Sequence, residues 1–272
     1  MKNIVMKKGF LFLIVLLMLT MAVGCSPNSA DSENSSMTKE EAYAIYYDTI
    51  EKFVPELMTE PQECDVDIQI RDEVTFLTEH FVRNTTVKIN AQNVDGKLQY
   101  YLLNKFPEAN KMNLYCIDDD KFYSISCGLN EKGNLKEQNA AHISSFIFPY
   151  LNTPLFKQEA IMSFASEKNG TDVKMTFVID GSKMEYGYPQ RVMKEINPSL
   201  NDKLDNINLV LTIDKDGVPK TMSAEISMSL FNDAGGLHAK KTLNMDYVFK
   251  KFDNVDFDLQ DVISQYTVAT SS

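Results

Sequence analysis

The feature that most constrains the fold of this chain is a strict alternation of polar and apolar residues. Between Thr221 and Leu230 every even-numbered residue is apolar and every odd-numbered residue is polar. Successive side chains of a β-strand point to opposite faces of the sheet, whereas a helix repeats every 3.6 residues. The segment is therefore predicted to be a strand with one face in the core and the other in water.

The same alternation recurs along much of the chain, in residues 85–91, 172–179, 207–213 and 243–249. Asp95-Gly96, Asn169-Gly170 and Asp216-Gly217 adjoin these runs, and residues 118–120 form a further acidic turn. Such dipeptides favour tight hairpins because their residues tolerate positive φ. We predict a mostly β (α+β) fold, in which eight to eleven strands form a large curved antiparallel sheet with one apolar face.

Three helices are expected beside this sheet. Residues 38–41 read Thr-Lys-Glu-Glu, a capping-box pattern that begins an amphipathic N-terminal helix ending before Pro55. Shorter helices are predicted at residues 139–150 and 189–196. Their expected role is to cover the apolar face of the sheet.

The N-terminus has the three-part order of a bacterial export signal. Three lysines precede an uncharged run at residues 9–23, and Gly24-Cys25 follows. The run of about 15 residues is short for a membrane span, which needs roughly 20. Residues 22–25 (Ala-Val-Gly-Cys) resemble the lipobox of bacterial lipoproteins, although Ala22 stands where that family usually has Leu. An ordinary secretory cleavage site is the alternative.

By this resemblance, residues 1–24 are a signal peptide, and Cys25 carries a diacylglyceryl group with acyl chains such as palmitate. Residues 25–37 form a flexible tether, because they are rich in Ser, Asn and Asp and hold almost no apolar side chains. Residues 38–272 are predicted to form a single domain. The expected location is extracytoplasmic, at the outer face of the plasma membrane of a Gram-positive cell, with the membrane as partner through the lipid on Cys25.

Charge excludes some partners. Removing the signal peptide removes three of the 27 basic residues and none of the 38 acidic ones, so the remaining chain has a net charge of −14. Nucleic acid is a poor partner for such a surface. The sequence does not determine an oligomeric state.

The three remaining cysteines are an odd set and cannot all pair within one chain. A hairpin turning at Asp119-Asp120 would place Cys116 opposite Tyr123 and not opposite Cys127. We expect Cys64, Cys116 and Cys127 to be mostly buried free thiols. A disulfide from Cys64 to one of the others is the alternative.

Motifs of catalysis and cofactor binding are missing from the sequence. It contains no G-x-S-x-G, H-E-x-x-H, C-x-x-C or P-loop pattern, and its three histidines, at 80, 142 and 238, are far apart. The acidic run at residues 118–120 lacks the Gly and Glu of a calcium loop. We therefore expect no enzymatic activity, no metal and no cofactor.

The order of lipobox, tether, amphipathic helix and long antiparallel sheet resembles the LolA/LppX-like superfamily of bacterial lipoproteins, most evidently at residues 208–230. The resemblance implies a half-barrel around an apolar cavity that holds a lipid or acyl chain. The candidate lining residues are Met175, Phe177, Leu209, Leu211, Ile213, Met222, Ile226 and Met228. The alternative is a packed core without a ligand, in an interaction or structural module of the cell envelope.

Overall fold

A computed structural model describes residues 37–54, 58, 62–76, 79–131, 133–138, 153–184, 201–232 and 234–269. The expected signal peptide, Cys25 and most of the tether lie outside these residues. So do the two predicted covering helices at residues 139–150 and 189–196. No helix within the described part has the length and apolar character needed to cross a membrane.

The N-terminal helix α2 spans Lys39–Glu51 and begins as its sequence predicts. The Glu41 amide donates to the Thr38 hydroxyl, and the Thr38 amide donates in return to the Glu41 carboxylate at 2.8 Å. These two bonds satisfy amides that the first helical turn leaves unpaired. The bonds that the Thr38 amide and the Thr38 hydroxyl donate to the Glu41 carboxylate lower the pKa of Glu41 below its usual value.

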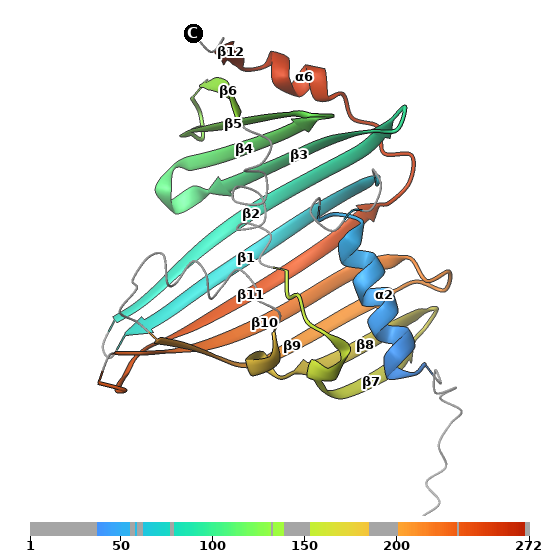
Figure 1. Ribbon diagram of the computed structural model, residues 1–272, viewed down its shortest axis with the longest axis vertical. Coiled ribbons are helices and arrows are strands. Elements are labelled where there is room, and N and C mark those ends of the chain that lie inside the picture. Colours follow the sequence, from blue (N-terminus) through green and yellow to red (C-terminus); the bar gives the residue numbers. More distant parts are fainter. Residues whose placement is uncertain are drawn as a thin grey trace, which may run out of the picture. The chain divides into compact units, whose positions relative to one another are not determined.

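The predicted mostly β class is confirmed: twelve strands form one sheet in the order β12-β6-β5-β4-β3-β2-β1-β11-β10-β9-β8-β7 (Figure 1). Their bounds are β1 Cys64–Phe76, β2 Glu79–Val94, β3 Lys97–Phe106, β4 Lys111–Asp118, β5 Lys121–Gly128, β6 Asn134–Gln138, β7 Ile161–Asn169, β8 Asp172–Ile179, β9 Asn201–Ile213, β10 Pro219–Phe231, β11 Leu237–Lys251 and β12 Thr267–Ala269. Short 3₁₀ turns occupy Pro107–Ala109, Gln158–Ala160 and Gly181–Lys183, and helix α6 spans Leu259–Ser264. The sheet does not close on itself, because β12 and β7 form its two edges.

The predicted hairpin turns are present. Gly96, Gly170 and Gly217 have φ of 82°, 64° and 81°, and Asp95 also has positive φ, at 54°. These are backbone conformations that side chains disfavour. The acidic turn before β5 places Cys116 directly opposite Tyr123, as its sequence predicts.

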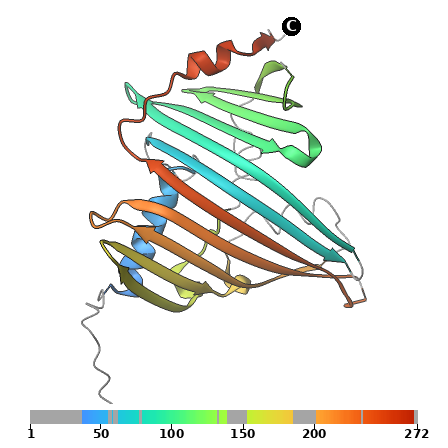
Figure 2. The same cartoon turned by 180° about the vertical axis from the view of Figure 1, so that it is seen from behind.

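The strands do not form one continuous meander. Strands β1 to β6 run in sequence order on one side, β11 to β7 run on the other, and β1 pairs with β11 where the two sets meet (Figure 2). Strand β1 was not predicted, because it lies outside the alternating runs from which the strands were predicted. Strand β12 lies at one edge of the sheet, parallel to β6. It brings the number of strands to one more than the predicted maximum of eleven.

Both faces of the sheet carry apolar clusters. We call the side on which α2 packs the inner face and the opposite side the outer face. The inner face carries the larger cluster, which extends from β1–β5 across β11, β10, β9 and β8 and includes residues of α2. On the outer face a smaller cluster joins Leu114, Ile125 and Leu135 to Leu259 of α6.

Candidate ligand-binding face

The structure brings the eight predicted lining residues together on the inner face. Met175, Phe177, Leu209, Leu211, Ile213, Met222, Ile226 and Met228 all belong to the inner cluster, and none is more than 4% exposed. They share one face because strands β8, β9 and β10 pair in register, as in the row of Met175, Leu211 and Met222. Whether they line a ligand remains a prediction.

Helix α2 lies across this part of the inner face (Figure 1). The ring of Tyr46 stacks on Phe156 at 4.9 Å between centroids and lies 6.2 Å from Phe177. At the other end of the helix, Phe53 lies 5.8 Å from the ring of Tyr247 on β11. One of the eight lining candidates, Phe177, therefore already contacts α2.

Hydrogen bonds fix this aromatic layer to a loop backbone. The hydroxyl of Tyr46 donates to the Pro154 carbonyl, and that of Tyr43 donates to the Phe156 carbonyl at 2.9 Å. Burial raises the pKa of Tyr46 and of Tyr247 well above the usual value. Both phenols therefore stay neutral and serve as hydrogen-bonding parts of the core.

A charged cluster lies on the inner face near the ends of β1, β2 and β11. One carboxylate oxygen of Asp72 accepts from Arg83 at 2.9 Å and from Lys241 at 3.0 Å. The Asp72 side chain is only 8% exposed, so its charge needs both cations. The alternation of apolar residues in the sequence gave no sign of this cluster.

An uncharged polar pair lies further across the sheet. Asn104 on β3 is directly opposite Asn113 on β4, and both are buried. The carboxamide of Asn104 has no hydrogen-bond partner at either its oxygen or its nitrogen. Such a group costs on the order of 1–3 kcal/mol relative to a satisfied one. In the sequence, the sign of this buried pair is that the polar Asn104 follows Tyr100 and Leu102 at alternate positions.

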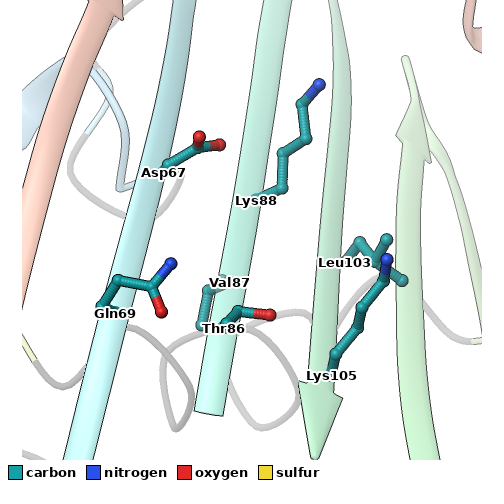
Figure 3. A pocket seen from close by; sticks show the side chains of 7 residues that line it. All are labelled: Asp67, Gln69, Thr86, Val87, Lys88, Leu103 and Lys105. Carbon is teal, nitrogen blue, oxygen red and sulfur yellow. The ribbon is translucent and has the colours of Figure 1, made fainter. Parts of the chain in front are cut away.

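A shallow pocket of about 250 Å³ lies elsewhere, on the surface around β1, β2 and β3 (Figure 3). Its lining residues are Asp67, Gln69, Thr86, Val87, Lys88, Leu103 and Lys105. Asp67 is already paired with Lys250 at 2.5 Å. The exposed lysines 88 and 105 make this depression suited to a polar or anionic group and unsuited to an acyl chain.

The cysteines in the described part are free. Burial raises the pKa of the Cys64 thiol, and it raises the pKa of Cys116 to about 12. Cys127 is only partly buried, and its pKa is also raised. The expected free thiols are confirmed, and the alternative disulfide from Cys64 is not formed. Within the described residues, no three His, Cys, Asp or Glu side chains gather as a metal site.

No family model and no curated protein sequence matches the chain. Among solved structures, an outer membrane lipoprotein-sorting protein domain from Vibrio parahaemolyticus is 13% identical, with a TM-score of 0.29, over 83% of this chain and 99% of that one. A DUF1329 family protein from Desulfovibrio piger is 9% identical, with a TM-score of 0.27, over 80% and 98%. The ywiB protein from Bacillus subtilis is 8% identical, with a TM-score of 0.23, over 70% and 94%.

A lipoprotein-sorting domain, the kind of protein that the sequence resembles, is therefore among the solved structures that match. TM-scores this low carry no inference about function. Function has to be inferred from the geometry of the inner face.

Proposed function

We propose that this protein is a membrane-tethered, non-enzymatic module that binds a hydrophobic or amphipathic molecule, such as a lipid or acyl chain, on the inner face. The observation that carries the proposal is the breadth of the apolar surface. Twelve strands at about 4.8 Å spacing span roughly 50 Å. A helix of 13 residues is about 20 Å long and 10–12 Å wide, so α2 covers only part of that surface.

The part of the inner face on β3, β4 and β5, beside the strands that α2 crosses (Figure 1), is the better candidate for the ligand. Leu102, Tyr115, Ile117 and Phe122 supply its apolar side chains from β3, β4 and β5. In the described residues, α2 is the helix packed on the inner face. Its Tyr46 lies near Phe177 of β8, and Phe53, which follows the helix, lies near Tyr247 of β11. A ligand that also reached the eight predicted lining residues would have to displace Tyr46 from Phe177.

The anchor belongs to the same proposal. A lipid on Cys25 and a tether at residues 25–37 would hold a domain of residues 38–272 beside the outer face of a bacterial plasma membrane. Replacing Cys25 with Ala is expected to abolish labelling by radioactive palmitate and to release the protein from the membrane fraction. Unchanged labelling of Cys25→Ala would refute lipidation at this residue without bearing on the ligand.

The ligand is tested with single tryptophans, because the chain contains none. Tyr115→Trp places a reporter on the inner face, and Tyr101→Trp is its matched control on the outer face. A bromine-labelled acyl chain is expected to quench the first reporter and to leave the second unchanged. Equal quenching of the two, or none of either, would contradict the proposal, as would native mass spectrometry and organic extracts that contain no lipid.

An interaction module with a packed core is the second candidate, and the apolar end of the β1–β2 hairpin favours it. Phe81 is 54% exposed there and lies 6.0 Å from the ring of Phe76. Leu237, at the start of β11, is 48% exposed. Exposed apolar patches of this kind mark contact surfaces. This candidate is favoured over ligand binding if a protein co-purifies with the unmodified chain but not with Phe81→Ser. The bromine-labelled acyl chain should then fail to quench the tryptophan of Tyr115→Trp.

A further inference from the structure

Asn104 is the one inward residue of β3 between Tyr100 and Phe106 that is polar. Its neighbours at inward positions, Tyr100 and Leu102, belong to the apolar cluster. Asn104 is 1% exposed, and both polar atoms of its side chain are without a hydrogen-bond partner. A buried polar group in this state calls for an explanation, since proteins satisfy most such groups.

The surroundings of Asn104 combine a second amide with an apolar surface. Asn113 is directly opposite on β4, where paired side chains stand about 5 Å apart at Cβ. Val87 is opposite on β2, and its own partner Ile68 continues the apolar row. A ligand at this position would meet carboxamides at one end and aliphatic side chains along its length.

The chemistry of the pair favours an uncharged ligand group. A carboxamide offers two donors and an acceptor at one place, which complements a hydroxyl or another amide. In the charged cluster of the inner face, Arg83 and Lys241 are already bonded to Asp72. A carboxylate would bring a charge into a buried region where the amides cannot neutralise it.

We propose that Asn104, together with Asn113, binds the neutral, hydrogen-bonding head group of an acyl-chain amphiphile, whose chain lies along the apolar inner face. The ligand class is a glyceryl ester with free hydroxyls or an acyl amide. The ligand then forms the hydrogen bonds that the Asn104 side chain otherwise lacks. This assignment rests on the proposed function, because it presupposes that an acyl chain binds the inner face.

Two ligands that differ only in the head group test the assignment on the unmodified protein. Monoolein and methyl oleate carry the same chain and ester, and only monoolein has free hydroxyls. Displacement of the apolar dye N-phenyl-1-naphthylamine is expected to show monoolein binding about tenfold more tightly, the difference that one hydrogen bond makes. Equal affinities would overturn the assignment.

The variant Asn104→Leu tests the residue itself, since leucine has a similar volume and no polar atoms. It is expected to remove the tenfold preference for monoolein, to leave methyl oleate binding unchanged and to raise the melting temperature. The matched control Asn208→Leu makes the same exchange at an exposed position of β9 and is expected to keep the preference.

The possible failures are distinguishable. If Asn104→Leu retains the preference, the head-group assignment is wrong while the proposed function stands. If neither ligand displaces the dye from the unmodified protein, the proposed function fails and the assignment fails with it. Should Asn104→Leu lose its β-sheet circular dichroism, the comparison of the two ligands on the unmodified protein still decides the question.

Discussion

The junction between β1 and β11 allows a quantitative test of how the sheet is held together. Ile68 lies at the middle of β1, has no exposed surface, and is opposite Val87 on β2 and Tyr247 on β11. Residues from both sets of strands therefore pack around this one side chain. We expect Ile68→Ala to destabilise the whole sheet and not one half.

The magnitude follows from the burial of Ile68. Truncation removes three carbon groups at about 0.8 kcal/mol each, or about 2.4 kcal/mol of transfer free energy. A residual cavity of roughly 50 Å³ adds about 1.2 kcal/mol at 24 cal/mol per Å³. The expected loss in free energy of unfolding is therefore about 3.6 kcal/mol. Ile68→Val should lose about 1 kcal/mol, and Val248→Ala, at a position that is 45% exposed, less than 0.5 kcal/mol.

The assay is urea unfolding followed by two probes. Far-ultraviolet circular dichroism reports on the whole sheet, and reactivity of the buried Cys116 thiol reports on the strands β3 to β5. Both transitions of Ile68→Ala are expected to shift together to lower urea. A loss below about 1 kcal/mol, or a shift in only one probe, would refute the view that β1 couples the two sets of strands.

Three further predictions concern the helices and thiols. In the native protein a thiol reagent should modify Cys127 faster than Cys64 or Cys116, as measured by mass spectrometry. Because the pKa of Cys127 is raised, the rate of its modification should still be rising above pH 9. Thr38→Ala should cost about 1 kcal/mol by thermal unfolding at pH 7. That cost should shrink as pH falls through the lowered pKa of Glu41, since protonation removes the charged partner of Thr38. Leu259→Ala should cost about 3 kcal/mol and increase binding of an apolar dye to the outer face; an unchanged melting temperature would show that α6 is not anchored there.

Local sequence patterns were sufficient to predict the hairpin turns. Asp95-Gly96 predicts a turn in which both residues have positive φ, and Asp216-Gly217 predicts one in which Gly217 does. The pairing of β1 with β11 could not be predicted in the same way. Ile68 and Tyr247, which pair across these strands, are 179 residues apart in the sequence, and no turn fixes the register of the two strands.

Strands β3 and β4 show why part of the candidate site was not visible in the sequence. Tyr100 and Leu102 face inward while Tyr101 and Leu103 pack against the outer cluster, so both faces are apolar and the alternation disappears. Strand β4 reads as a nearly continuous buried run for the same reason. Without an alternating background, an inward Asn104 does not stand out as an exception.

The outer face helps to explain why the unpaired amide of Asn104 is informative. There the chain supplies its own cover: Asp258 caps α6, Gln260 donates to Asp118 at 3.0 Å, and Leu259 fills the apolar cluster. The same chain satisfies the buried hydroxyl of Tyr46 on the inner face with a backbone carbonyl. A packed core would gain stability from Leu at position 104 and lose nothing. Ligand binding predicts the same gain in stability with a loss of head-group selectivity, so stability and binding measured on one variant separate the two functions.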